Sequence, residues 1–497
     1  METHMLSLED IIKITNGHCI NNVLPTSTKI NNINIYVDKI QKGDVFVALN
    51  SQKYSNTDGC LGFTGNEDSV FGFAGEKNGY DDINEAINKG AIAIIVDNIK
   101  VVSSNYNCNF IYVDDSLDAL CSLSSEILKK SKVKTIAISG SVGKTTTASY
   151  LNNILATKYK VLKSDYIRST VLGLAIEIIE KIDNTIDFYI VELQSDGVGQ
   201  IQKMCKSIVI DYAIITEITD SHLSKFQSIN NIIFEKTTTY RYLNRNGFIL
   251  INNDNEHLKK WYLENSHDKR IITVGTNNNS VYFVDNHFNF NVASIEKKQN
   301  DSSVLGKLCV NNSIDIHAVL LCISFFELIN NNCISIKEIN SILNTIKPTY
   351  LRYNKFLGKN NCIVIIDSYN ASYLSMKTGI AKACADNSKK VILVLGSMLE
   401  LAGNTEILHK EIGKQILQYK NITNIFLLGE NMLYTYFTLK KFSNNKHVVH
   451  SFSYEKIINE LLKVELNENT LVYIKGSGAM RMELIAPYVL SSMEALQ

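Results

Sequence analysis

The segment from Thr135 to Thr147 constrains this chain more than any other part of the sequence. An apolar run with the character of a buried strand leads into a turn with two glycines, and a helix is predicted to begin around Lys144. Glycines allow successive backbone N–H groups to turn toward a phosphate, and the N-terminus of the following helix adds its positive dipole. The segment therefore predicts a strand, turn and helix that bind the phosphates of a nucleotide.

Individual residues of this turn have predicted roles. The Lys144 ammonium is expected to reach the outer phosphates, and the Thr145 hydroxyl is expected to hold magnesium. The general motif has a glycine where Ile138 stands, so only a shorter form is present, and a chance glycine turn before a helix is the alternative. The predicted nucleotide-binding residues of the turn are Gly140, Ser141, Gly143, Lys144, Thr145 and Thr146.

Composition narrows the class of protein. The chain has 497 residues, of which 45% are hydrophobic, so two to three globular domains are expected. Lys plus Arg and Asp plus Glu both number 50, which gives no reason to expect nucleic acid or a membrane as partner. No apolar run reaches the roughly 20 residues that cross a bilayer and no signal peptide is recognisable, so a cytoplasmic location is expected. The 10 cysteines stand singly, which argues against a zinc site or a disulfide framework.

The order of apolar runs and helical stretches predicts an α/β chain of three domains. Residues 1–115 are expected to form a small α/β domain, residues 116–346 a central P-loop ATPase-like domain with a doubly wound parallel sheet, and residues 347–497 a Rossmann-like domain. The polar stretch 50–78 is predicted to be a long surface excursion. Strands are expected at 44–49, 91–96, 188–193, 212–216, 362–366, 390–395, 425–428 and 471–474, and a helix at 82–89.

Further motifs accompany the glycine turn along most of the chain. They are Lys42–Leu49 and Ala86–Ala91 upstream, and Asp367–Ala371, Val394–Leu401 with His409, Lys475–Ser477 and Met480–Glu483 downstream. Together with the short glycine turn and its threonine run, they resemble the Mur ligase family, whose members add amino acids to the peptidoglycan precursor. The resemblance implies an N-terminal domain that binds a UDP-sugar-type substrate and a C-terminal domain that binds the incoming amine.

The resemblance also implies roles for three central residues. Glu192, at the end of a predicted strand, matches a metal-binding glutamate, and His222 matches a histidine that binds a second magnesium ion. Lys236 stands where many members carry a carbamylated lysine, which supplies magnesium with an anionic oxygen. The implied metal ligands are Thr145, Glu192, His222 and Lys236, and the implied catalytic residues are Lys144, His222 and Lys236. Without the resemblance, an ordinary loop acid, a surface or core histidine and an exposed helical lysine are the alternatives.

The resemblance implies that Arg352 and Asp367 reach ATP from the third domain, so that the site is complete only when that domain closes. A plain surface cation and a strand-end cap are the alternatives for these two residues. The implied reaction is the ATP-dependent joining of a carboxylate to an amine through an acyl phosphate. The cofactors are ATP and two Mg²⁺ ions, and the partners are a small carboxylate acceptor and an amino acid or dipeptide, bound by a monomer.

The specific substrates implied are a UDP-N-acetylmuramoyl peptide as acceptor and D-alanyl-D-alanine as amine. Tyr36–Asp38 stands where the family usually has an Asp-Ser/Thr-Arg triplet that holds the uridine nucleotide. The sequence therefore leaves open a paralogue that uses a carboxylate without UDP. The stretch that ends at His317 aligns with a run of asparagines expected near adenine. A further alternative is a protein that binds a nucleotide without catalysing a reaction.

Overall fold

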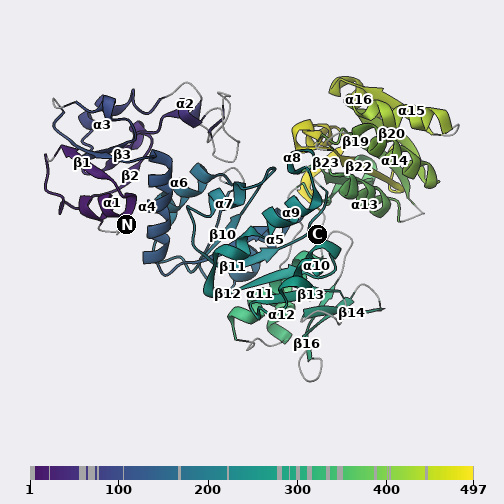
Figure 1. Cartoon of the computed structure of the whole chain (residues 1–497). Coiled ribbons are helices and arrows are strands. Elements are labelled where there is room, and N and C mark those ends of the chain that lie inside the picture. Colours follow the sequence, from purple (N-terminus) through teal and green to yellow (C-terminus); the bar gives the residue numbers. More distant parts are fainter. Residues whose placement is uncertain are drawn as a thin grey trace.

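The structure is a computed structural model that describes residues 6–21, 23–54, 63–64, 73–74, 78–103, 106–165, 169–220, 223–276, 282–289, 292–297, 303–309, 316–331, 336–343, 351–385, 389–399, 401, 404–442 and 446–495. Figure 1 shows the described elements in three groups that follow the sequence, from purple at the N-terminus through teal to yellow-green. Each group is built around one large sheet, and a separate two-stranded sheet, β4-β5, accompanies the first. The predicted α/β class is therefore confirmed.

The first sheet has the strand order β1-β7-β6-β3-β2, and its pairs are parallel except for β1 with β7. Its strands are β1 (His18–Asn21), β2 (Ile33–Asn34), β3 (Val45–Val47), β6 (Ala93–Val96) and β7 (Asn109–Tyr112), with helices α1 (Leu8–Thr15) and α3 (Ile83–Asn88). The expected strands at 44–49 and 91–96 and the helix at 82–89 are thus present. Within the predicted excursion at 50–78, α2 (Ser51–Tyr54), β4 (Phe63–Thr64) and β5 (Phe73–Ala74) are described, and most of the remainder lies outside the described residues.

The second sheet has the order β16-β15-β14-β13-β12-β11-β8-β10-β9, and it is parallel from β9 to β14. Its strands are β8 (Lys134–Ser139), β9 (Val161–Lys163), β10 (Phe188–Glu192), β11 (Ile210–Ile215), β12 (Leu243–Asn252), β13 (Ile271–Gly275), β14 (Tyr282–Asn289), β15 (Val292–Lys297) and β16 (Ser303–Cys309). Alternate residues of β8 enter different apolar clusters, since Ala137 packs on one face and Ile136 and Ile138 on the other. Both faces are therefore covered, as predicted for a doubly wound sheet.

Helices line both faces of this second sheet. They are α4 (Ser116–Lys130), α5 (Lys144–Leu155), α6 (Val171–Lys181), α7 (Gln200–Met204), α8 (Leu223–Phe226), α9 (Ile229–Lys236), α10 (Glu256–Asn265), α11 (Ile316–Ile329) and α12 (Ile336–Leu343). The cluster that contains α6 also contains α4 and α1, so one apolar core runs from the first group into the second. The cluster on the opposite face joins α5 to α11.

Strand register brings the functional ends of the second sheet together. In the parallel ladder, Glu192 at the end of β10 pairs with Ile138 of β8, and Ile215 at the end of β11 pairs with Ser139. The carboxyl ends of β10, β8 and β11 therefore meet at one edge, directly before the glycine turn. Ligands of open parallel sheets bind at such an edge.

The third sheet has the order β21-β20-β19-β22-β18-β17-β23, parallel from β21 to β18 and antiparallel at β17 and β23. Its strands are β17 (Asn354–Gly358), β18 (Ile363–Asp367), β19 (Lys390–Gly396), β20 (Ile422–Leu428), β21 (His447–Ser451), β22 (Thr470–Lys475) and β23 (Leu490–Ala495). Helices α13 (Tyr373–Ala383), α14 (Thr405–Gln418), α15 (Met432–Phe442) and α16 (Tyr454–Leu461) accompany them. The four strands predicted in this region correspond to β18, β19, β20 and β22, whereas β17, β21 and β23 were not predicted.

The predicted domain limits stay predictions. At the first limit, the Asp115 carboxylate caps α4 by accepting hydrogen bonds from the N–H groups of Leu117 and Asp118. The second limit lies among residues 344–350, outside the described residues. Among the described helices, none has both the length and the apolar character that a bilayer crossing requires.

Candidate active site

The glycine turn is pressed against the end of β11. Gly140 has a φ of +140°, and a Cβ atom there would lie 2.2 Å from the Thr216 hydroxyl, so no larger residue fits without rearrangement. Gly143, with a φ of +90°, is the residue before the first turn of α5. The Ser141 N–H donates to the Glu217 carbonyl over 2.6 Å. The predicted strand, turn and helix are therefore present, and the two glycines adopt conformations that favour glycine.

Lys144 begins α5, and its side chain folds back over the turn. Its ammonium donates to the carbonyls of Gly140, at 2.8 Å, and Ser141, at 3.3 Å. These carbonyls hold the charge at the mouth of the turn, where an incoming phosphate would meet it. Thr146, which was also predicted to bind the nucleotide, lies two residues after Lys144 in α5. Its side chain is buried and packs against the interior of the protein.

Thr145 and Glu192 meet beside the turn. The Thr145 hydroxyl donates to Glu192 Oε2 over 2.8 Å, and only 1% of the Glu192 surface is exposed. Among the described residues, the second carboxylate oxygen, Glu192 Oε1, has no hydrogen-bond partner although it is buried. A buried carboxylate oxygen of this kind is costly unless a donor or a cation satisfies it. The residues present therefore fit a hard divalent cation, for which a carboxylate and a hydroxyl are suitable ligands.

Lys236, at the end of α9, is buried at the same edge. Its amine donates to the carbonyl and to the hydroxyl of Ser195, both at 2.7 Å, and lies 5.3 Å from the centre of the Phe226 ring. Burial lowers the pKa of this amine well below its ordinary value, and the nearby charge of Lys144 lowers it further. The surroundings thus favour a neutral amine, which is the form that reacts with CO₂.

The neighbour of Lys236 fixes the loop that follows Glu192. The Glu235 carboxylate, fully buried, accepts the N–H groups of Gly199 and Ile201 at the start of α7, each over 2.6 Å. Two successive residues of α9 therefore hold one loop at both ends, and that loop carries Ser195. Sequence reasoning did not identify Ser195; its signal was only its place shortly after a strand-end acid.

His222 lies outside the described residues, so its predicted role as a metal ligand stays a prediction. In the part of the chain that is described, no group of three or more His, Cys, Asp or Glu side chains is gathered as a metal site. Of the four predicted ligands, only Glu192 and His222 are residues of these four types. The other two are the Thr145 hydroxyl and the modified Lys236, which belong to other residue types.

Arg352 and Asp367 lie in the third group, at the carboxyl edge of its sheet. Asp367 Oδ2 accepts hydrogen bonds from the Lys475 ammonium at 2.9 Å and from the Tyr473 hydroxyl at 2.7 Å. Burial lowers the pKa of Lys475, against the effect of the Asp367 charge. Lys475, which ends β22, holds Asp367 in place and was not predicted as a site residue, although its position after an apolar strand could have indicated it.

The third group contacts the glycine turn through Tyr369. The Tyr369 hydroxyl lies 3.1 Å from Thr145 Oγ1, and the guanidinium carbon of Arg352 lies 4.1 Å from the centre of the Tyr369 ring. The structure therefore brings together Lys144, Thr145, Glu192 and, through Tyr369, Arg352. Sequence reasoning missed Tyr369 because nothing local shows which residue of a loop will cross to another sheet.

His317, which ends the stretch aligned with asparagines expected near adenine, contacts a carboxylate. The His317 Nε2 atom lies 3.0 Å from Asp254 Oδ2, which also accepts the Thr276 N–H over 2.6 Å. Burial raises the pKa of Asp254, but the bonds from His317 and Thr276 outweigh it and leave the pKa below its ordinary value. His317 is thereby oriented by a carboxylate.

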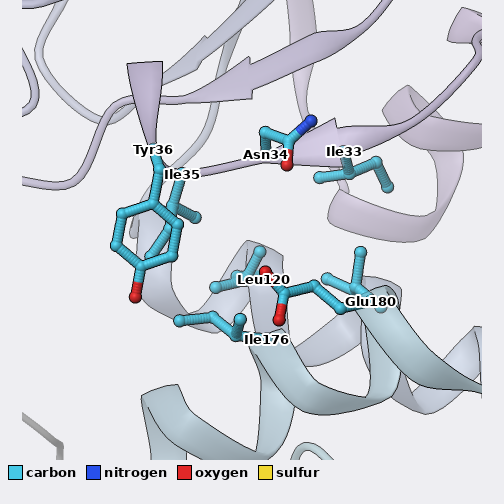
Figure 2. A pocket seen from close by; sticks show the side chains of 8 residues that line it. Ile33, Asn34, Ile35, Tyr36, Leu120, Ile176 and Glu180 are labelled. Atoms are coloured by element: carbon cyan, nitrogen blue, oxygen red, sulfur yellow. The ribbon is translucent and has the colours of Figure 1, made fainter. Parts of the chain in front are cut away.

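The segment that replaces the expected uridine triplet borders a small cavity between the first group and the second. Figure 2 shows Asn34 and Tyr36 facing Ile176 and Glu180 of α6 across this cavity. Its volume of about 10 Å³ is at the lower limit for a single water molecule. Beside it, the Lys39 ammonium pairs with Glu180 over 2.5 Å. A lysine thus lies one position after the triplet, where it joins the two groups.

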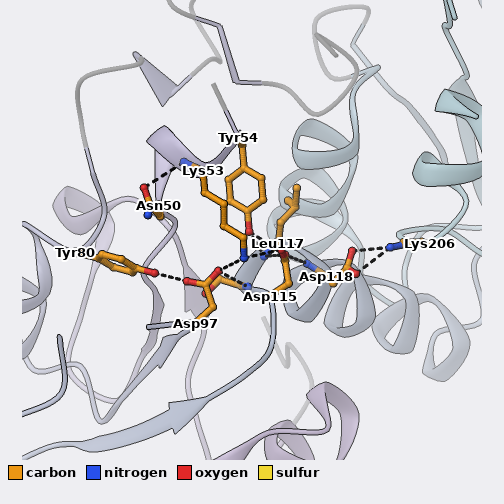
Figure 3. A network of polar contacts seen from close by, with 10 residues as sticks. Asn50, Lys53, Tyr54, Tyr80, Asp97, Asp115, Leu117, Asp118 and Lys206 are labelled. Carbon is orange, nitrogen blue, oxygen red and sulfur yellow. Dashed lines mark hydrogen bonds and ion pairs between the residues drawn. The ribbon is translucent and has the colours of Figure 1, made fainter. Parts of the chain in front are cut away.

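A polar network occupies the carboxyl edge of the first sheet (Figure 3). The Lys53 ammonium lies 2.6 Å from Asp97 and 2.8 Å from Asp115, and the hydroxyls of Tyr80 and Tyr54 donate to the same two carboxylates. Burial would raise the pKa of Asp115, but the bond from Lys53 and those from the α4 backbone outweigh it and lower that pKa. The charges here are satisfied by one another.

Comparison with known proteins identifies the family. The family model described as "Mur ligase middle domain" matches residues 138–320, and that described as "Mur ligase, glutamate ligase domain" matches residues 352–478. The two matches together cover the glycine turn, Glu192, Lys236, Arg352 and Asp367. The chain belongs to the Mur ligase family. The family resemblance of the sequence is thereby confirmed.

Relatives of this Mur ligase chain match along most of its length. A UDP-N-acetylmuramoyl-tripeptide–D-alanyl-D-alanine ligase of Rickettsia prowazekii is 28% identical over 94% of this chain and 96% of its own length. The ligase of the same description from Bacillus subtilis is 27% identical over 83% of this chain and 88% of its own.

Solved structures support the fold of this Mur ligase chain. MurF from Acinetobacter baumannii matches with a TM-score of 0.77 and 18% identity, over 98% of this chain and 99% of its own. MurF ligase from Thermotoga maritima, solved in complex with ADP, matches with a TM-score of 0.71 and 21% identity, over 94% of this chain and 98% of its own. The predicted three-domain architecture is the one these neighbours share.

Proposed function

We propose that this Mur ligase chain joins D-alanyl-D-alanine to a UDP-N-acetylmuramoyl tripeptide in an ATP-dependent reaction. The observation that carries the proposal is the meeting of Lys144, Thr145 and the half-satisfied Glu192 carboxylate at one sheet edge. The relatives that match over most of the chain are ligases of this description, and they support the choice of substrates. The division into an acceptor domain, a nucleotide domain and an amine domain at 115/116 and 346/347 is part of the proposal.

The nucleotide would bind with its phosphates over the glycine turn. Backbone N–H groups from Gly140 to Thr146 and the start of α5 would receive the phosphate oxygens, and Lys144 would exchange its carbonyl partners for the outer phosphates. Arg352 and Asp367 would contact ATP from the third group. Asp367 is held for this by Lys475 and Tyr473.

Mg²⁺ would be held by Thr145 and Glu192, with His222 and carbamylated Lys236 as the proposed further ligands. Bound there, two such ions would neutralise charge on the transferring phosphoryl group. The Glu192 oxygen that lacks a partner among the described residues supports this assignment. Carbamylation would convert the buried Lys236 amine, poorly suited to carry a positive charge there, into an anion that a cation can satisfy.

The reaction would proceed in two steps. An oxygen of the acceptor carboxylate forms a bond to the γ-phosphorus, and the bond to the β-phosphate oxygen breaks with its electron pair going to ADP. The neutral amine then attacks the acyl carbon, loses a proton to water, and expels phosphate to leave an amide. The protein's contribution is positioning and charge stabilisation, since neither step requires the chain to form a covalent bond.

One observation favours a second kind of acceptor, a carboxylate that carries no UDP. Tyr36–Asp38 replaces the expected triplet, and the Lys39 beside it is engaged by Glu180. This pair lies directly after the triplet position that is expected to hold uridine, so a carboxylate without UDP is the competing substrate. We further propose that the chain acts as a monomer in the cytoplasm, where ATP and small carboxylates are available; light scattering of the purified chain tests the monomer.

The test is product formation with defined substrates. The chain is incubated with ATP, Mg²⁺, D-alanyl-D-alanine and either UDP-N-acetylmuramoyl tripeptide or the same acceptor without its uridine nucleotide. The proposal expects one phosphate and one amide per turnover with the first acceptor, and none with Lys144→Ala. Turnover only with the second acceptor favours the paralogue, and ATP binding without phosphate release from any acceptor favours a protein without catalysis.

A further inference from the structure

Tyr369 joins two sheets at the phosphate site. It lies in the loop after β18 of the third sheet, yet its hydroxyl lies 3.1 Å from Thr145 Oγ1 in the first turn of α5. The two residues are 224 positions apart in the chain. The third group therefore delivers one polar atom to the place where a metal and a terminal phosphate are proposed to bind.

The direction of this hydrogen bond follows from counting protons. A threonine hydroxyl has one proton, and Thr145 donates it to Glu192 Oε2 over 2.8 Å. The proton between Thr145 and Tyr369 must then come from the phenol. Tyr369 is therefore a donor whose O–H points at Thr145 Oγ1, directly after the glycine turn.

The Tyr369 ring is held in this position from two sides. The guanidinium carbon of Arg352 lies 4.1 Å from the ring centre, a stacking distance for a cation on an aromatic face. The backbone N–H of Tyr369 donates to the Leu351 carbonyl over 3.1 Å. Since the side chain is braced, its hydroxyl is presented at a defined point.

We propose that the Tyr369 hydroxyl exchanges its partner Thr145 for the phosphoryl group and donates its hydrogen bond to that group while it passes from ATP to the acceptor carboxylate. The inference rests on the proposed function, because it assigns a role in that same reaction. Donors fixed where charge develops stabilise a transition state without reorganisation, and phosphoryl oxygens are strong acceptors. Phosphorus gains its bond to the carboxylate oxygen and loses its bond to ADP, while Tyr369 keeps its proton throughout.

This role makes transfer depend on contact between the groups. Lys144 and Thr145 belong to the second group, and Tyr369 is supplied by the third. Phosphoryl transfer in the absence of that contact would lack one donor, so ATP would be protected from reaction until the third group has closed.

The first experiment removes the hydroxyl alone. Tyr369→Phe keeps the ring that Arg352 stacks on, and kcat is expected to fall roughly 10- to 100-fold with the KM for ATP within about threefold of the wild type. Tyr373→Phe is the matched control, because Tyr373 begins α13 in the same region and its ring is approached by Lys377. The control should keep the wild-type kcat. A wild-type kcat in Tyr369→Phe would overturn the inference, as would an equal loss in both variants.

The second experiment does not need the acceptor. Affinities for Mg·ADP are measured with and without aluminium fluoride, which mimics a phosphoryl group in transfer. The wild type should bind ADP more tightly with the fluoride, and Tyr369→Phe should lose roughly 10- to 100-fold of that gain while its affinity for ADP alone is unchanged. An equal gain in both proteins, or no gain in the wild type, overturns the inference. If the gain behaves as expected but no acceptor yields product, the proposed function fails and the contact to the phosphoryl group is retained.

Discussion

The carboxyl edges of the first and second sheets carry similar residues arranged in opposite ways. At the first edge, Lys53 is paired with Asp97 and Asp115. At the second edge, the Lys144 ammonium donates to the backbone carbonyls of Gly140 and Ser141, and one oxygen of Glu192 lacks a partner among the described residues. The first edge satisfies its own charges, whereas the second leaves a buried carboxylate oxygen for a ligand.

This difference indicates which of the two charged clusters is a ligand-binding site. Opposite charges that satisfy one another stabilise the packing of their elements, here the first sheet against α4. A buried carboxylate oxygen that lacks a hydrogen-bond partner lowers the free energy of unfolding, unless a bound ligand compensates for the loss of its hydration. Substitutions at the first edge should therefore affect folding, and those at the second should affect ligand binding and turnover.

The largest effect is expected for Lys144→Ala. Turnover should fall by about 1,000-fold or more, because the ammonium that neutralises the outer phosphates is lost, while the free energy of unfolding stays within about 0.5 kcal/mol. Phosphate release and urea unfolding measure the two quantities. A large loss of stability would show that this lysine resembles Lys53, and the comparison of the two edges would fail.

Glu192→Gln should follow, with kcat reduced roughly 100-fold and more Mg²⁺ needed for half-maximal activity. Its stability should be unchanged or higher, since the substitution removes a buried negative charge. Glu177→Gln is the matched control, because that buried carboxylate is bonded to Lys181 and Tyr189. The control should be less stable than the wild type and keep its Mg²⁺ requirement; the reverse pattern would refute the assignment.

Lys236→Arg should lower kcat roughly 10- to 100-fold, because a guanidinium neither reacts with CO₂ nor offers an oxygen to a cation. Carbon-13 NMR with labelled bicarbonate should detect a carbamate in the wild type and none in the variant. A fully active wild type without a carbamate signal would show that the lysine acts unmodified.

Lys53→Ala tests the first edge. Removing the ammonium leaves Asp97 and Asp115 facing each other, so the free energy of unfolding should fall by about 1–3 kcal/mol. Affinity for Mg·ADP, measured by calorimetry on the folded protein, should not change. An unaltered unfolding transition combined with weaker ADP binding would contradict this prediction, because Lys53 would then contribute to ligand binding and not to stability.

The smallest expected effect is a pH dependence of stability at the first edge. The pKa of Asp115 is lowered on folding, so its contribution is present above the unfolded pKa and is lost as the pH falls through the folded pKa. The wild type should therefore lose more of its thermal stability than Asp115→Asn between about pH 5 and pH 3. Parallel melting curves for the two proteins over that interval would contradict this account.

The sequence predicted the second edge well because its signals are local. Gly140 and Gly143 have to adopt positive φ values, and Lys144 has to follow them directly, so the chemistry is contained in a few adjacent residues. Glu192 and Lys236 were found through the family resemblance, which records contacts between distant segments. Buried strands such as β10 and β22 were predicted from their apolar runs to within one or two residues.

The parts that were not predicted depend on contacts between segments far apart in the chain. Tyr369 and Lys475 fall within two motifs of the family resemblance, but neither was given a role, because their neighbours at the site come from other strands or from another sheet. Strands β21 and β23 were missed because edge strands carry a weaker apolar signal than central ones, and β17, which lies next to β23, was missed with them. The network around Lys53 joins α2, the end of β6 and the start of α4, and no local pattern links those three.

The most direct test of an acyl phosphate follows oxygen atoms. The acceptor is labelled with ¹⁸O in both carboxylate oxygens, and the phosphate released during amide formation is analysed by mass spectrometry. The account predicts one ¹⁸O in each phosphate, because the carboxylate oxygen that attacks phosphorus leaves with it. Phosphate without ¹⁸O would contradict the account, since the oxygen would then have come from water.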